Sequence, residues 1–300
     1  MARFSIDTAL KSGFRLARRE WGAVLVWGAA YLLLSLAMQM VSIGAALPAY
    51  MRNLRDDPEG AAAALEQASA AQAFVTLPVA LVLGLALGTL IYGAVCRAML
   101  RPDERGFFFM RLQRRELSML LTMLAMGVLA MLVIVPIVVV TGGLVGGVSA
   151  VTGTPGWPWA VLIGGAATAG YLYLAARFSL AWVMAWDEQR FVLLDSWRLT
   201  KGQGWRMVLA AIALLFLLLI VAIVVMIPVA IVAGIFFAVA GMAGGAAAAI
   251  VISLVAIAGL IFFAAFNGVF VAAVAAAYVE IYRELRGVGL PGGETAEVFA

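Results

Sequence analysis

The sequence contains no histidine and a single cysteine, Cys96. Without histidine the chain lacks the most frequent general base, the most frequent metal ligand and the side chain that ordinarily titrates near neutral pH. Histidine-dependent catalytic triads and His-Glu-x-x-His metal sites are therefore excluded. One cysteine within an apolar run cannot form an internal disulfide or a thiolate cage for a metal ion.

Charge is also scarce, because charged residues make up 12% of the 300 residues while hydrophobic residues make up 65%. The mean hydropathy is +1.08, and soluble domains are only about 45–50% apolar. We therefore expect an all-α integral membrane protein, folded as a single membrane domain over residues 1–300. The apolar run that begins at Trp21 is too long for a signal peptide, so we interpret it as an uncleaved first span.

Six apolar runs are long enough to span a bilayer, which takes roughly 20 residues. They cover residues 21–47, 74–96, 117–141, 158–183, 207–240 and 246–278. The last two are separated by the glycine-rich residues 241–245, which indicate a tight turn. The fold class predicted from this spacing is six transmembrane helices arranged as three helical hairpins.

Basic residues fall almost entirely on one side of these spans: of the 20 Lys and Arg, only Arg52 and Arg55 lie on the other. Basic flanks stay in the cytoplasm, so we predict that both termini are cytoplasmic. An acidic loop at 49–73 and an uncharged loop at 142–157 would then be external, and 287–300 would form a short cytoplasmic tail. The preference for arginine over lysine and the abundance of Ala and Gly are typical of GC-rich bacteria, which indicates a bacterial inner membrane.

A short basic pattern recurs ahead of each odd-numbered span. The residues from Arg15 read RLARRE, those from Arg111 read RLQRRE and those from Arg198 read RLTK. Repetition in the same phase relative to the spans indicates an internal threefold repeat. The repeat units cover approximately residues 5–100, 104–186 and 190–286, and each would consist of a basic interfacial helix followed by a hairpin.

The first basic segment has the character of a helix lying in the membrane interface, since Ile6, Leu10 and Phe14 share one helical stripe. We name the following residues the basic collar, as candidate contacts for anionic lipid headgroups or a partner: Arg15, Arg18, Arg19, Arg111, Arg114, Arg115, Arg177, Arg198, Lys201 and Arg206. The alternative is that they set only topology and anchoring. Membrane lipids, a membrane-protein partner or a second copy of the chain are the expected partners, and nucleic acid is not.

The span interiors contain almost no ionisable residues, which are the usual mark of function inside a membrane. Arg177, near the cytoplasmic end of the fourth span, is the exception. Its side chain either extends to the interface or is buried and paired, with Asp187, Glu188 and Glu280 as candidate partners. No nucleotide-binding loop, nucleophile elbow or metal-binding carboxylate pair is found, so we expect no enzyme, cofactor or metal site.

The segment 177–209 carries a longer pattern, in which an arginine closes the fourth span and Ser-Trp-x-Leu-Thr-x-Gly-x-x-Trp opens the fifth. Its members are Arg177, Glu188, Ser196, Trp197, Leu199, Thr200, Gly202 and Trp205. With the tyrosine-bearing, charged tail 277–286, it resembles a broad group of bacterial six-span proteins related to the membrane domain of glycerophosphoryl diester phosphodiesterases. The resemblance implies a role as a membrane accessory or scaffold protein, whose specific function is unassigned. The phosphodiesterase activity resides in a separate catalytic barrel, which we do not expect here because the sequence ends shortly after Arg286.

Two functions follow from these observations. The first is a non-enzymatic inner-membrane accessory or scaffold protein that contacts anionic lipid or envelope partners through the basic collar. The alternative is a small transporter or channel for a lipid-like or hydrophobic solute, since the lack of intramembrane charge argues against ions as cargo. A lateral apolar cleft leading to Arg177 would favour lipid handling, and a sealed bundle would favour a scaffold.

Overall fold

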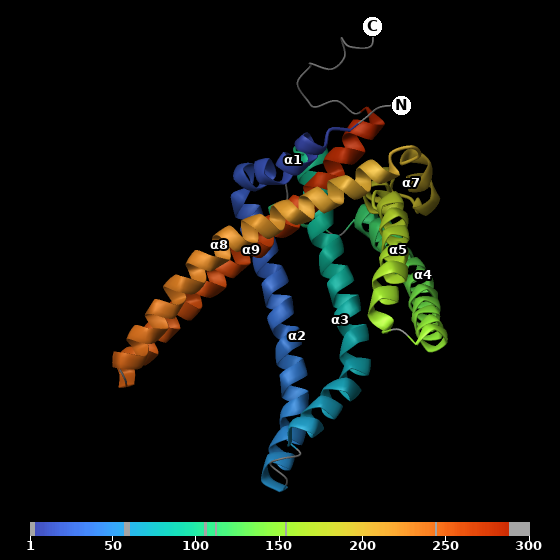
Figure 1. Ribbon diagram of the computed structural model, residues 1–300. Helices are drawn as coiled ribbons and strands as arrows, with labels where there is room; N and C mark the ends of the chain where they lie inside the picture. Colours follow the sequence, from blue (N-terminus) through green and yellow to red (C-terminus); the bar gives the residue numbers. More distant parts are fainter. Residues whose placement is uncertain are drawn as a thin grey trace.

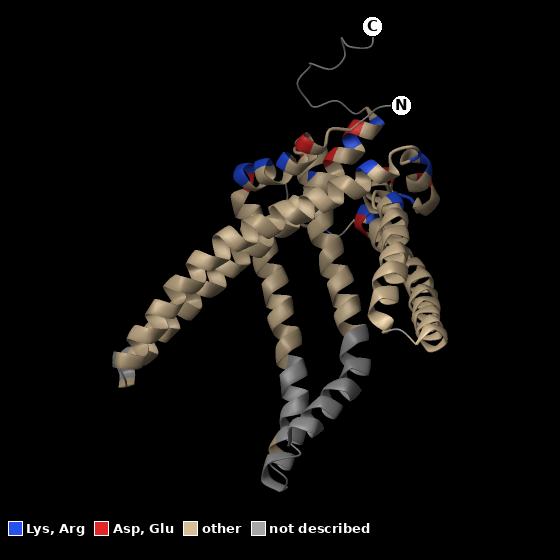
Figure 2. Cartoon of the chain, viewed as in Figure 1, with Lys and Arg blue, Asp and Glu red and all other residues tan. Residues whose placement is uncertain are grey.

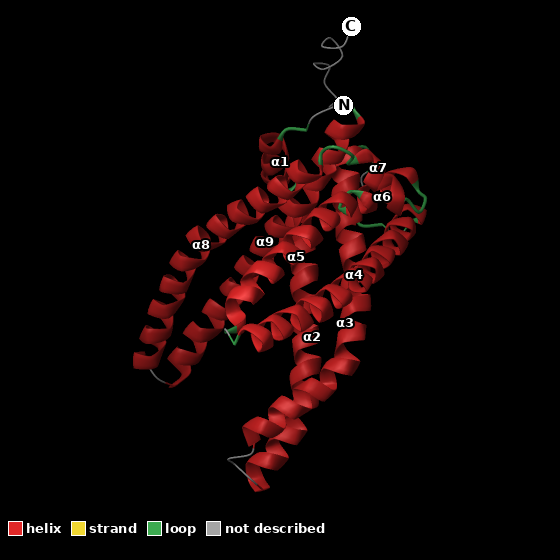
Figure 3. Cartoon of the chain, turned by 45° about the vertical axis from the view of Figure 1, so that its right-hand side comes forward, coloured by secondary structure: helices red, strands yellow, loops and turns green. Residues whose placement is uncertain are grey.

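The computed structural model describes residues 4–56, 61–104, 107–111, 113–153, 155–243 and 245–287. Within these ranges the chain forms helices and connecting turns (Figure 3). Their bounds are α1 Ile6–Arg19, α2 Trp21–Asp56, α3 Ala61–Leu100, η1 Phe107–Phe109, α4 Arg114–Thr152, α5 Gly156–Phe178, α6 Ala181–Glu188, α7 Leu193–Leu199, α8 Gly204–Ala243 and α9 Gly245–Arg286. The predicted tail 287–300 lies outside the described residues beyond Gly287.

Six segments of the described chain are long and apolar enough to cross a membrane. They belong to α2, α3, α4, α8, α9 and to α5 continued by α6. The prediction of an all-helical, multi-pass membrane protein is therefore confirmed at this level. By their length and composition, these helices require lipid around them.

Long helices that follow each other in sequence lie side by side, as α2 with α3, α4 with α5 and α8 with α9. The three pairs diverge from one end of the molecule (Figure 1). This converging end also holds α1, α6, α7 and the C-terminal part of α9. The short helices α1, α6 and α7 thus lie where the long helices meet.

Side-chain burial is concentrated at the converging end. Trp27 and Trp186 are fully buried there, whereas no residue in the most apolar window of α4 is buried. Lipid tails are as apolar as leucine side chains, so an exposed apolar helix face carries no penalty in a membrane. The converging end is therefore the packed core of this protein.

Close backbone contacts join the first helices to the last one. A methyl group at Gly28 of α2 would overlap the carbonyl oxygen of Ala264 in α9, and one at Gly268 would overlap that of Val24. Gly13 of α1 lies equally close to Ala273. Small residues at such crossings let helix backbones approach, which is how membrane helices gain packing energy.

The helices extend further than the sequence indicated. Helix α2 continues to Asp56 and α3 begins at Ala61, so most of the segment 49–73 is helical and only residues 57–60 of it lie outside the described backbone. Helix α4 runs to Thr152 and ends at Gly153, whose φ of 65° terminates it. The predicted loop 142–157 is thus mostly helix, because glycine is tolerated within membrane helices. The predicted fourth span 158–183 lies within the candidate span Gly156–Glu188, which is made of α5, ending at Phe178, and α6, beginning at Ala181.

The three basic lead-in segments differ from one another. The first forms α1, whose N-terminus is capped by the Ser5 hydroxyl, and the third contains the short helix α7. The second forms the single turn η1, with Phe108 and Phe109 at positive φ, so the helix expected there is absent from the described residues. The carbonyls of these two phenylalanines instead accept hydrogen bonds from Trp27 Nε1, at 3.0 Å, and from Arg97.

Candidate functional site

Among the described residues, charged side chains gather at the converging end, as the blue and red segments of Figure 2 show. The far ends of the coloured helices are free of them. Many of these charges pair with one another, and a smaller set faces outward. The paired charges stabilise the fold, whereas the outward-facing charges are accessible to a ligand or a membrane surface.

The most deeply buried ion pair joins Arg97, at the end of α3, to Glu116, at the start of α4. Their side chains are 0% and 1% exposed. Glu116 Oε1 also accepts a hydrogen bond from Trp186 Nε1 at 3.1 Å, and its Oε2 accepts one from the backbone N–H of Gln113 at 3.0 Å. The carboxylate therefore caps α4 and holds α3 and α6 to it, which is a structural task.

Gly93 makes room for this cluster, since a Cβ there would lie 3.2 Å from Glu116 Cγ. The guanidinium carbon of Arg115 lies over Trp186, 5.2 Å from the centre of one of its rings. Arg115 also pairs with Glu104 at 3.5 Å. A hydrogen bond from Arg101, aided by the charge of Arg115, lowers the pKa of Glu104.

Arg177, at the end of α5, is 5% exposed and turns inward. Its Nε donates to the Thr200 hydroxyl at 2.9 Å, its Nη2 to the Trp197 carbonyl at 2.6 Å and its Nη1 to the Tyr173 hydroxyl at 3.3 Å. The guanidinium carbon lies 4.0 Å from the centre of a Trp197 ring. The α7 turn thus encloses the cation with neutral oxygens and an aromatic face.

Of the two arrangements expected for Arg177, the structure has the buried one, but its partners in the described part of the chain are neutral. The three candidate carboxylates have other partners. Asp187 accepts a hydrogen bond from Tyr282 at 2.7 Å, Glu188 pairs with Arg190 and Arg286, and Glu280 pairs with Arg283. The reason is local: Ser196 and Thr200 both donate to the Arg177 carbonyl, so α7 is fixed over this residue.

The structure separates the members of the basic collar by exposure. Those with exposed side chains are Arg15, Arg18, Arg19, Arg111, Arg114, Arg198 and Lys201. Arg115 is half-buried in the Glu104 pairing, and Arg206 is half-buried near the Phe4 ring, with its Nη1 lacking a partner among the described residues. Only the exposed set, together with Arg206 in part, can reach a ligand or a membrane surface.

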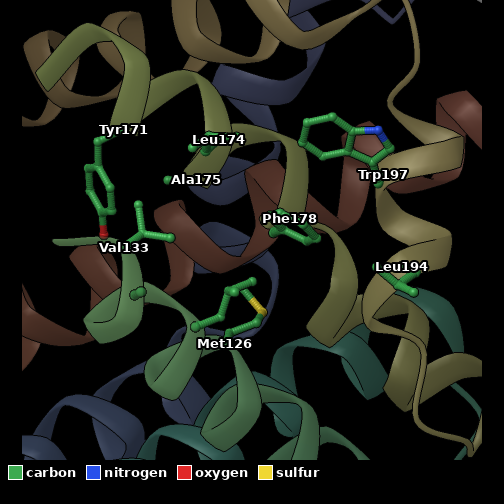
Figure 4. A pocket seen from close by; sticks show the side chains of 10 residues that line it. Met126, Val133, Tyr171, Leu174, Ala175, Phe178, Leu194 and Trp197 are labelled. Carbon is green, nitrogen blue, oxygen red and sulfur yellow. The ribbon is translucent and has the colours of Figure 1, made fainter. Parts of the chain in front are cut away.

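An apolar pocket of about 520 Å³ opens between α4, α5 and α7 (Figure 4). Met126 and Val133 line it from α4, Tyr171 and Phe178 from α5, and Trp197 from α7. Trp197 also covers the Arg177 guanidinium. An apolar cleft is therefore present beside α4 and α5, and the tryptophan that covers Arg177 is one of its lining residues.

Sequence reasoning did not single out Arg97 or Glu116 as candidate site residues. A usable signal existed for the arginine, because Arg97 directly follows the predicted second span as Arg177 closes the fourth. Glu116 is the acidic residue in the repeated RLQRRE segment. Their pairing depends on how the turn at Phe107–Phe109 folds back, and that path carries no sequence signature.

Comparisons with protein-family models, with curated proteins and with solved structures find no match for this chain. The structure by itself defines a helical membrane protein whose packed core is a charged, aromatic end.

Proposed function

We propose that the chain is a non-enzymatic accessory or scaffold protein of a bacterial inner membrane, a member of the six-span group it resembles. In this proposal both termini are cytoplasmic, the long helices cross the bilayer as three hairpins, and the basic collar contacts anionic headgroups or partner proteins. The observation that carries the proposal is the division of the collar. A buried set of charges holds the fold together, and Arg18, Arg111, Arg114 and Lys201 face outward.

Electrostatics supports this role for the outward set. Each basic residue next to an anionic leaflet contributes roughly 1 kcal/mol of attraction. The diverging helix pairs add a second supporting feature, because their apolar faces are exposed along most of their described length. Such faces are available to lipid or to the membrane helices of a partner.

The test is lipid retention by the purified full chain in mild detergent, measured by native mass spectrometry. Changing Arg18, Arg111, Arg114 and Lys201 together to Gln should reduce retained phosphatidylglycerol and leave phosphatidylcholine unchanged. A matched control changes Arg52 and Arg55, which we place on the opposite side of the membrane. Equal phosphatidylglycerol retention in both variants and the wild type would reduce the collar to a topology signal and refute the proposal.

The apolar pocket between α4, α5 and α7 favours the second candidate, handling of a lipid-like solute. Its walls are almost entirely apolar and it lies beside a candidate span. Leu174→Trp would fill it, with Leu172→Trp on an exposed position of the same helix as the control. Loss of a bound hydrophobic probe in the first variant alone supports this function, and binding unaffected by Leu174→Trp rejects it.

A further inference from the structure

Each even-numbered span ends in a buried arginine. Arg97 closes α3, Arg177 closes α5 and Arg283 lies in the last turn of α9, with exposures of 0%, 5% and 8%. The first two find hydrogen-bond acceptors in the basic segment that follows them in the chain. Arg97 binds Glu116 and the Phe109 carbonyl, and Arg177 binds Thr200 and the Trp197 carbonyl.

The third arginine meets the remaining basic segment, because α1 packs against α9. Among the described residues, however, α1 supplies no hydrogen-bond acceptor to Arg283. Arg283 has a 3.5 Å contact to Glu280 on its own helix, and Glu280 lies 4.0 Å from Arg15 of α1. Both distances are long for a strong charge-assisted hydrogen bond, which is normally about 2.7–2.9 Å.

The sequence repeat shows which acceptor is missing. Glu20 ends RLARRE as Glu116 ends RLQRRE. Glu116 reaches Arg97, whereas Glu20 caps α1 in a non-helical conformation and pairs with its neighbour Arg19 at 3.5 Å. Within the described residues no ion pair joins Glu20 to Arg283, so the position that Glu116 fills in the second unit is left open in the first.

A cavity of about 290 Å³ lies between α1 and α9, beside Arg283. Arg15, Arg19 and Arg283 line it together with Glu280 and Ser12, so positive groups outnumber the negative one. The volume far exceeds the 10–15 Å³ that a single water needs. Arg15 and Arg19 are 58% and 57% exposed and form an accessible rim.

We infer that this cavity between α1 and α9 binds a phosphate group, which takes the place that the Glu116 carboxylate has beside Arg97. Guanidinium groups bind phosphate oxygens with paired hydrogen bonds, and three arginines around one cavity suit a tetrahedral anion. The phosphate can belong to a lipid headgroup or to a soluble phosphate compound. The inference rests on the proposed role of the collar in binding anionic headgroups and locates one discrete site within it.

The experiment uses the purified full chain in neutral detergent, with two probes. Inorganic phosphate is titrated at constant ionic strength while thermal unfolding is followed by tryptophan fluorescence, and phosphatidylglycerol retention is measured by native mass spectrometry. Arg283→Gln should weaken binding about tenfold or more, and Glu280→Gln should tighten it by removing the competing carboxylate. Arg101→Gln, outside the cavity, is the control. Should Arg283→Gln not fold, the largely exposed Arg15 allows Arg15→Gln to test the same cavity.

Arg283-dependent binding of inorganic phosphate alone identifies a soluble phosphate ligand, and Arg283-dependent retention of phosphatidylglycerol alone identifies a lipid. The inference is overturned when neither probe depends on Arg283 or Arg15, or when Glu280→Gln weakens binding. Its failure is separable from that of the proposed function. Lipid retention could depend on Arg18, Arg111, Arg114 and Lys201 but not on Arg283. That result rejects the discrete phosphate site and still supports lipid binding by the basic collar.

Discussion

Removing the Glu116 carboxylate should destabilise the protein strongly, because the buried Arg97 would keep only the more distant Glu104, 3.9 Å from its Nε, as a counter-ion. Breaking a buried pair by removing one partner typically costs about 3–5 kcal/mol. Glu116→Gln and Arg97→Met should each fall in this range. Glu116 also accepts hydrogen bonds from Trp186 and from the Gln113 backbone, so the loss for Glu116→Leu should lie at the upper end.

The double variant Arg97→Met/Glu116→Leu separates the pair from its surroundings. It leaves no buried charge, so its destabilisation should be smaller than the sum of the singles by about 2–3 kcal/mol. Unfolding by increasing dodecyl sulfate in mixed micelles, followed by tryptophan fluorescence, measures each free energy. Arg101→Gln is the control, since its 3.0 Å pair with Glu104 is 40% and 37% exposed and worth under about 1 kcal/mol. Additive effects of the two single substitutions would refute the reasoning.

Three further outcomes follow from the same end of the molecule. Gly28→Ala should destabilise by about 1–3 kcal/mol or more, while Gly22→Ala, with open space around it, should not. Thr200→Val should lose about 1–3 kcal/mol because Arg177 Nε loses its acceptor, and Thr200→Ser should retain most of that. Stability should decrease slightly as pH falls through the lowered pKa of Glu104, and Glu104→Gln should remove that slope. Micellar unfolding checks all three.

The existence of the spans followed from the sequence because lipid imposes a simple length requirement. Their ends did not follow as well. The glycine and threonine residues after Val140 were interpreted as a loop, yet α4 continues to Thr152. In a membrane the backbone must satisfy its own hydrogen bonds, so a helix continues through residues that would end it in water.

The charged core illustrates the opposite limit of sequence reasoning. Arg177 was recognised because a charge inside a span is conspicuous. Its partners were not predicted. The three carboxylates expected to pair with it, Asp187, Glu188 and Glu280, instead contact Tyr282, Arg190 and Arg283. The geometry of α7 decides instead that neutral oxygens surround the cation. Pairing between distant segments depends on the tertiary structure, so a local sequence pattern does not predict it.

Lipid solvates an apolar helix face as well as another helix does, so apolar contact alone does not fix how the three helix pairs are placed. The specific interactions lie elsewhere: the glycine crossings at Gly28 and Gly268, and the arginines that close α3 and α5. A buried arginine is satisfied by few arrangements, whereas an apolar stripe tolerates many. The positions of the helix pairs should therefore depend on contacts at the converging end. The exposed lengths of the helices should remain available to lipid or to the membrane helices of a partner.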